Sequence, residues 1–126
     1  MDIKPSYEYI HDIITLYGTN TPCGVFVAIG EMTQFYGIIL SINNKKRDDP
    51  EFDMNDTFLF DVLYRKILTP DYVKWSDIQI DELFNWVDKN IMVIMALWKT
   101  HRYGGTVSIN GLEYDNFGLI DLFEMP

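Results

Sequence analysis

The sequence has little cysteine and histidine, and it lacks long hydrophobic runs. Of its 126 residues, one is cysteine (Cys23) and two are histidine. A lone cysteine excludes an intramolecular disulfide and a zinc site built from several cysteines. The longest uninterrupted apolar run, Ile91–Trp98, is much shorter than the ~20 residues that a membrane-spanning helix requires. We therefore expect no membrane association.

A secretory signal pattern is missing from Met1–Pro5, which has no basic stretch followed by an apolar one. Because a lone cysteine also gives no sign of an oxidising compartment, we expect a cytoplasmic location.

The short motifs of catalytic sites are absent too. The sequence contains no GxGxxG, GxxxxGK[ST], GxSxG or HExxH. Cys23 with His11 or His101 would make a nucleophile and base, but no local pattern supports either pair. Adjacent carboxylates occur on segments expected to be exposed, whereas acid–base catalysis needs one of them desolvated. We therefore expect no enzymatic activity and no cofactor.

Oxygen-bearing side chains alternate from Asp49 to Asn55, as they do in a calcium-binding loop. However, Met54 stands where the turn of such a loop needs glycine, and Phe60 stands where a bidentate glutamate belongs. No close histidine pair is present either. We expect an exposed acidic loop without a metal site.

Positive charge is scarce. The sequence has ten Lys and Arg residues and nineteen Asp and Glu residues, which gives a net charge of −9. A chain this acidic is repelled by phosphate backbones, so we expect no direct nucleic-acid binding and instead attraction to a protein with a basic surface. Solubility alone is the competing explanation of the charge.

The residues that are present predict one domain spanning 1–126. Hydrophobic residues make up 48% and aromatic residues 15% of the chain, which suits a packed core and not a disordered tail. The expected fold class is α+β. Its elements are an N-terminal helix, a buried hairpin, a helical middle that ends in one long helix, and a short C-terminal hairpin.

Apolar residues at helical spacing predict two shorter helices. The first is Tyr7–Tyr17, with Ser6 as its N-cap and Gly18 as its stop. The second is Asp56–Leu68, which Pro70 would end. The expected buried stripes are Ile10, Ile13, Ile14 and Tyr17 in the first helix, and Leu59, Val62, Leu63 and Ile67 in the second.

Two interpretations of Val25–Ile42 compete. Two apolar runs rich in β-branched and aromatic residues predict a hairpin of buried strands. The alternative is one buried helix with Thr21 as N-cap and Pro22 in its first turn. Three glycines, Gly24 just before the stretch and Gly30 and Gly37 within it, favour the hairpin.

The best-defined element is a helix over Asp77–His101. Ser76 and Gln79 have the spacing of a capping box. Its second half, Ile91–Trp98, is apolar on all sides and must be covered twice, by the hairpin or by a second subunit. After it, Asn110-Gly111 predicts a β-hairpin, and Phe117–Phe123 is either a last strand or a short docking helix.

These features predict a partner-binding surface. The loop Asn43–Asn55 is expected to be exposed and mobile, and the first half of the long helix carries further acids. Trp86 and Tyr72 lie off the main apolar stripe and are expected to be exposed, as aromatic contacts of an interface are. The candidate partner-binding residues are Asp48, Asp49, Glu51, Asp53, Asp56, Asp81, Glu82, Asp88 and Trp86.

The leading hypothesis is therefore a small acidic inhibitor that binds another protein. The concrete form is an immunity or anti-defence protein of phage or mobile-element origin, which presents carboxylates where phosphates of a nucleic acid would lie. The alternative is a self-assembling structural or accessory protein, such as a virion or assembly component. It would form homo-oligomers through Ile91–Trp98.

A third hypothesis is a small-ligand site formed by Lys99, His101, Arg102 and Tyr103. The simpler explanation of this cationic cluster is that positive charges at the end of a helix complement its dipole.

Overall fold

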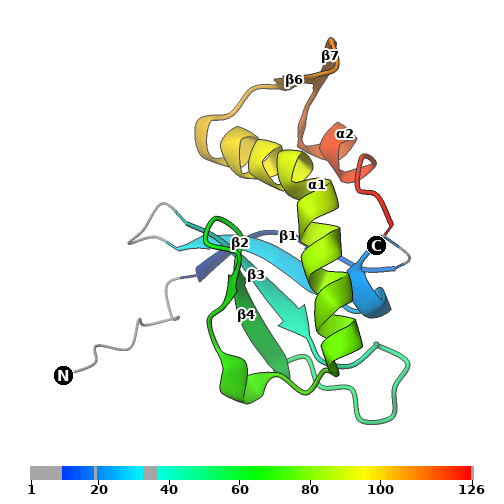
Figure 1. Cartoon of the computed structure of the whole chain (residues 1–126). Coiled ribbons are helices and arrows are strands. Elements are labelled where there is room, and N and C mark those ends of the chain that lie inside the picture. The colour runs from blue at the N-terminus through cyan, green and yellow to red at the C-terminus, as the bar shows by residue number, and fades with distance from the viewer. Residues whose placement is uncertain (1–9, 19, 33–36, 126) are drawn as a thin grey trace, which may run out of the picture.

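A long helix packs against an antiparallel sheet (Figure 1). The computed structural model describes residues 10–18, 20–32 and 37–125, and within them the main sheet has five strands. Each strand pairs with the next along the chain. The strands are β1 (Ile10–Leu16), β2 (Val27–Met32), β3 (Gly37–Asn43), β4 (Thr57–Asp61) and β5 (Lys66–Ile67).

The remaining elements confirm a mixed α+β fold. Two short 3₁₀ helices, η2 (Pro22–Gly24) and η3 (Pro70–Tyr72), lie in the connections of the sheet and before the long helix. The long helix is followed by a small hairpin and a short helix. These elements are α1 (Asp77–Tyr103), β6 (Val107–Ile109), β7 (Leu112–Tyr114) and α2 (Asn116–Ile120).

The predicted N-terminal helix over Tyr7–Tyr17 is wrong, because the described part of it forms β1. A β-bulge between Asp12 and Ile14 shifts the pairing register by one residue. Such a bulge breaks the alternation of a strand, and the apolar residues then fall at a spacing that resembles a helix. Beyond the bulge, Ile14 pairs with Ile29 across the sheet. Residues 7–9 lie outside the described residues.

The predicted helix over Asp56–Leu68 is also wrong. Its first half is β4, in which Phe58 and Phe60 are buried and Leu59 between them is half-buried. This alternation is typical of a strand with one face in the core. Pairing of β4 with β3 on one side and with β5 on the other outweighs the local helical pattern.

The favoured hairpin interpretation of Val25–Ile42 is confirmed, because β2 and β3 pair in antiparallel register. Pro22 begins the short η2 and not a long helix. The strands direct alternate side chains into the core beneath α1. The fully buried members of this face of the sheet include Val27, Ile29, Leu40, Ile42, Phe58 and Phe60.

The long helix is confirmed, and it extends two residues beyond the predicted end, to Tyr103. Ser76 and Gln79 form the predicted capping box. Gly104, with φ of 72°, ends the helix and donates its N–H to the Thr100 carbonyl. Within the described residues, no helix has both the length and the apolar character that crossing a bilayer requires.

The apolar second half of α1 is covered twice within the chain. The sheet covers one side, with Ile94 and Leu97 in the shared core. The C-terminal segment folds back over another side, where α2 contacts α1 and Leu119 is buried (Figure 1). The hairpin at Asn110-Gly111 is confirmed, and the tail beyond it contains the short docking helix and not a strand.

Trp86 is not exposed, contrary to its expected place on the surface. Its exposed fraction is 0%. Its indole N–H donates to the Asn20 carbonyl at 2.6 Å, and its ring stacks on Phe123 with 5.6 Å between centroids. Phe123, in the tail that covers Trp86, follows it by more than thirty residues in the sequence. Local periodicity cannot reveal a contact between residues so far apart.

We expect Trp86→Ala to lower the free energy of unfolding by about 3–5 kcal/mol, because it leaves a cavity under the tail. Urea denaturation followed by circular dichroism measures this loss. Ile78→Ala on the same helix, where 82% of the side chain is exposed, is the control and should change stability by less than about 0.5 kcal/mol. Equal effects of the two variants would contradict the burial of Trp86.

Candidate functional site

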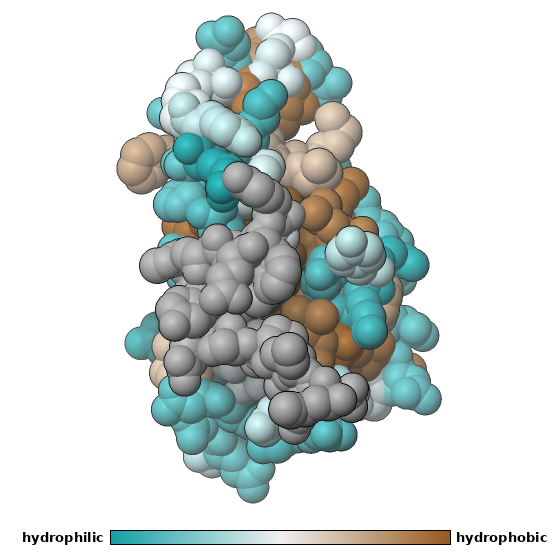
Figure 2. All heavy atoms as spheres, turned by 90° about the vertical axis from the view of Figure 1, so that its left-hand side faces the viewer, coloured by the Kyte–Doolittle hydropathy of each residue, from teal (hydrophilic) through white to brown (hydrophobic). Residues whose placement is uncertain are grey.

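The loop after β3 and the beginning of α1 lie at the same end of the molecule (Figure 1). This lower end is hydrophilic in Figure 2, which shows the molecule turned about the vertical axis. Two acidic segments that are separate in the sequence therefore lie at one end of the molecule (Figure 1). We call this end the acidic end; its acids are Asp48, Asp49, Glu51 and Asp53 of the loop and Asp77, Asp81 and Glu82 of the first turns of α1.

Contacts through η2 tie the two segments together. The backbone N–H of Cys23 donates to a carboxylate oxygen of Glu82 on α1. A cleft of about 570 Å³ is lined by Cys23, Glu82 and, from the loop, Lys46 and Asp48. A neighbouring cleft of about 230 Å³ is lined by Asp49 and by Gln79 of the first turn of α1, together with Lys45, Lys46 and Lys74. The structure thus brings Asp48, Asp49 and Glu82 of the predicted set together.

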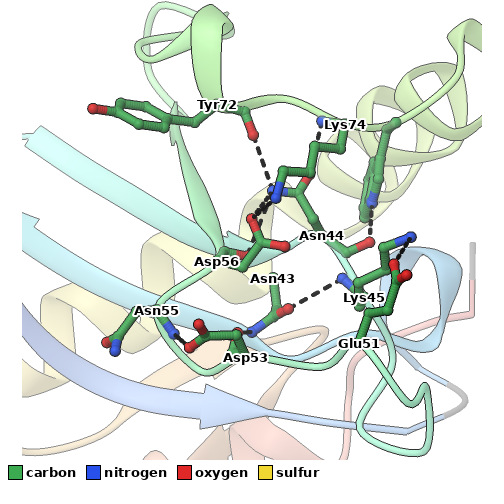
Figure 3. Close-up of polar contacts among 10 residues, drawn as sticks. Asn43, Asn44, Lys45, Glu51, Asp53, Asn55, Asp56, Tyr72 and Lys74 are labelled. Atoms are coloured by element: carbon green, nitrogen blue, oxygen red, sulfur yellow. Dashed lines mark hydrogen bonds and ion pairs between the residues drawn. The ribbon is translucent and has the colours of Figure 1, made fainter.

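Asn44 holds the loop against the body of the protein (Figure 3). Its side-chain amide donates to a carboxylate oxygen of Asp56 at 3.0 Å and to the Tyr72 carbonyl at 2.9 Å. Its side-chain oxygen accepts from the Lys74 backbone N–H at 2.9 Å, and its own carbonyl accepts from the Trp75 indole at 2.9 Å. Asn44 is buried, so these bonds are little exposed to competition from water.

Asn43 fixes the other side of the loop. Its amide donates to the Asp53 carbonyl at 3.0 Å, and its oxygen accepts from the Lys45 N–H at 3.1 Å. Within the loop, the Asp53 carboxylate accepts from the Asn55 N–H at 2.9 Å. The loop is exposed, as predicted, and hydrogen bonds of Asn43 and Asn44 hold it against the rest of the protein. Asn43 and Asn44 are not among the predicted site residues; the signal for them in the sequence is a pair of amides at the end of a strand.

Asp56 belongs to this scaffold more than to the exposed surface. Lys74 lies 3.0 Å from its carboxylate, and only 17% of the Asp56 side chain is exposed. Burial by itself would raise the pKa of Asp56, but hydrogen bonds from Lys74 and Asn44 and the charge of Lys74 outweigh burial and lower it. Asp56 is thus a charged anchor of the loop.

Asp88 lies apart from the acidic end, further along α1. Its two carboxylate oxygens accept from the Arg65 guanidinium at 2.8 and 2.5 Å. The guanidinium also lies 4.9 Å from the centre of the Phe84 ring. Of the predicted partner-binding residues, Asp56, Asp88 and Trp86 are therefore structural residues outside the acidic end, while the others belong to it.

The structure separates Cys23 from His101. Cys23 lies against the first turns of α1, and His101 lies near its end, about 33 Å away along a helix that rises 1.5 Å per residue. Burial, followed by the hydrogen bond and charge of Glu82, raises the pKa of Cys23 to about 12. The thiol is therefore neutral near pH 7 and poorly suited to nucleophilic attack. The side chain of His11 lies outside the described residues.

The predicted cationic cluster is at the far end of α1. Arg102 forms an ion pair with Glu31 of β2 at 3.0 Å and lies over the Trp98 ring, 5.7 Å from its centroid. Trp98 donates to the same Glu31 oxygen at 2.9 Å. Arg102 thus fastens the end of the helix to the sheet. Lys99, His101 and Tyr103 are exposed beside it.

Neither a metal site nor a known relative adds to this description. In the described parts of the chain, no three His, Cys, Asp or Glu side chains are placed to hold a metal ion. No protein-family model, curated protein or solved structure matches the chain.

We expect Asp56→Asn to lower stability near pH 6 and to have little effect in strong acid. Asp56 has a lowered pKa in the folded protein, so its contribution is complete above its ordinary value of 3.8 and is lost as pH falls through the folded value. Urea denaturation over a pH series measures the difference from wild type. The control, Asp48→Asn, removes an exposed carboxylate with no ion pair among the described residues; a pH-independent loss in Asp56→Asn would refute the assignment.

We expect Cys23 to react slowly with iodoacetamide in the folded protein. The rise of its pKa from 9.0 to about 12 lowers the thiolate population about a thousandfold near pH 8. Labelling followed by mass spectrometry should show fast reaction in urea, slow reaction when folded, and partial recovery in Glu82→Gln. Asp81→Asn is the matched control and should leave the rate unchanged. Equal rates in the folded and unfolded chain would contradict the burial and the Glu82 contact.

Proposed function

We propose that this protein binds a basic surface of another protein through its acidic end. The observation that carries the proposal is that an acid from the loop, Asp48, and an acid from α1, Glu82, line the same cleft beside η2, at the end of the molecule where both acidic segments lie (Figure 1). Like charges repel, so their gathering at one end has an electrostatic cost in the free protein. A cationic partner would remove that cost on binding.

The order of the loop supports the same proposal. Asn43 and Asn44 hold the loop in place through hydrogen bonds to residues on both sides of it. A surface that is ordered before binding loses less conformational entropy in the complex. Carboxylates on such a loop therefore keep their mutual spacing, which a flexible acidic tail would not.

The charges that face solvent are those a partner would meet. Asp48 and Asp81 are exposed, and neither forms an ion pair within the described residues. Glu51 has only a long, exposed contact of 3.8 Å with Lys45, which contributes little. The anchors Asp56 and Asp88 contribute to the negative field from within the scaffold.

The form of action that we infer is inhibition. Ordered carboxylates at one end of an acidic protein resemble the phosphates that a nucleic-acid-binding enzyme recognises, and they would occupy its basic groove. An immunity or anti-defence role in the cytoplasm, carried by a phage or mobile element, fits such an inhibitor. Competition with the natural nucleic acid is the property that defines this mode.

The test compares two triple variants of equal net charge. Asp48→Asn, Asp49→Asn and Asp81→Asn together remove three of the seven negative charges of the acidic end. Glu113→Gln, Asp121→Asn and Glu124→Gln neutralise three exposed acids elsewhere. Proteins captured from the host extract by the wild-type chain are purified, and their affinity for each variant is measured by calorimetry.

We expect the acidic-end variant to bind about ten- to a hundredfold more weakly and the control variant to bind as wild type does. Wild-type binding should weaken steeply between about 0.05 and 0.5 M salt, because the contacts are charged and exposed. A short DNA duplex should compete if the partner's nucleic-acid groove is blocked. Affinity that is independent of salt, or equally reduced in both variants, would refute the proposal.

A further inference from the structure

A second surface, distinct from the acidic end, exposes apolar side chains beside the middle of α1. Leu63 and Tyr64 in the turn between β4 and β5 are 50% and 83% exposed, and Met92 and Met95 on α1 are 66% and 43% exposed. A groove of about 340 Å³ runs between the turn and the helix. We call these four residues and the groove the Met92 face. Clustered exposed apolar side chains are typical of interaction sites.

The Met92 face is rigid. Arg65 adopts a left-handed backbone conformation with φ of 54°, which is unfavourable for a residue with a side chain. Its two hydrogen bonds to Asp88 and its contact with the Phe84 ring hold the turn against α1. The turn lines the groove together with Val87, Asp88, Ile91 and Met95 of the helix, and among the described residues Figure 1 shows no helix or strand in front of α1 there. The face is therefore ordered before any partner arrives.

The arrangement of side chains along α1 matches a second copy of itself. Asp88, Met92, Met95 and Lys99 follow at intervals of four, three and four residues, so they form one stripe along the helix. Met92 and Met95 lie equally far from the midpoint between Val93 and Ile94, and so do Asp88 and Lys99. Two such helices, antiparallel about a twofold axis at this midpoint, would place methionine on methionine and each aspartate opposite a lysine.

Charge also favours a second copy as the occupant. The whole chain carries −9 and its copies repel one another in general. The Met92 face, however, is bordered by Arg65, Asp88 and Lys99, so its local charge is nearly balanced. A strongly basic or acidic foreign partner would find no complementary field there, whereas a copy presents the same balanced set in reverse order.

We propose that two copies of this chain form a twofold-symmetric dimer through the Met92 face, with α1 antiparallel to α1 of the partner. The face offers four exposed apolar side chains, whereas a standard interface uses roughly 20–30 residues per partner, so we expect the dimer to dissociate on dilution. The acidic end lies at another part of α1 and stays accessible in the dimer. The inference does not depend on the proposed function.

The first test is the molar mass in solution. Sedimentation equilibrium of the wild-type chain from about 1 µM to about 1 mM should show a monomer–dimer equilibrium, since weak homodimers dissociate in this range. Met92→Glu should shift the dissociation constant by at least about tenfold. Met54→Glu is the matched control: the residue type and charge change are the same, its exposed fraction is 62% against 66% for Met92, and it lies outside the face.

The second test addresses the charge pairing. Lys99→Glu and Asp88→Lys should each weaken the dimer about tenfold, and mixing the two variants should restore it, because both contacts of the mixed dimer are then opposite in charge. Arg47→Glu and Asp48→Lys make the same charge changes in the exposed loop after β3, away from the face; these control variants should dimerise, alone and mixed, as the wild-type chain does. Lys99→Glu alone keeps the Arg65–Asp88 pair, so it tests the contact even if Asp88→Lys folds poorly.

A monomer at every concentration would overturn the proposal. A dimer that Met92→Glu leaves intact, or two weakened variants that fail to recombine, would overturn the assignment of the interface to this face and register. Binding of a foreign protein by a strictly monomeric chain would assign the face to a different occupant.

Discussion

The segment Ile91–Trp98 of α1 is apolar on all sides, and the rest of the structure depends on how it is covered. One layer, the sheet, buries Ile94 and Leu97, and the returning C-terminal segment buries a second side of the helix. The return is fixed by polar contacts as well: Asn90 donates to the Glu124 carbonyl at 3.1 Å and accepts from its N–H at 2.7 Å. Met92 and Met95 lie on a side of the helix that neither layer covers and stay exposed, and there we propose a contact with a second copy.

This arrangement gives the helix two surfaces of different character. Its beginning joins the loop after β3 in the acidic end, where charges are numerous and the scaffold is made of amide hydrogen bonds. Its middle joins the turn between β4 and β5 in the Met92 face, where methionines are exposed and charges balance. The acidic end suits long-range attraction of a basic protein, and the Met92 face suits a weak apolar contact between two copies of the chain.

Local pattern predicted some elements correctly and failed at others for identifiable reasons. The capping box at Ser76 and the turn at Asn110-Gly111 depend on neighbouring residues alone, and both are confirmed. The local pattern predicts helices at β1 and β4, where a bulge disturbs the alternation of one strand and strand pairing decides the conformation of the other. The local pattern also predicts an exposed Trp86, because Phe123, which stacks on it, lies far along the chain.

The sequence by itself determined the long helix, both hairpins, the excess of acid and the absence of catalytic motifs, because each depends on composition or on residues within a few positions. Only the tertiary structure decided which acids meet at one end, which become anchors, and which apolar side chains stay exposed. Those outcomes depend on contacts between distant segments, such as Cys23 with Glu82 and Arg65 with Asp88. Long-range pairing is set by the packing of the whole chain, and no local pattern encodes it.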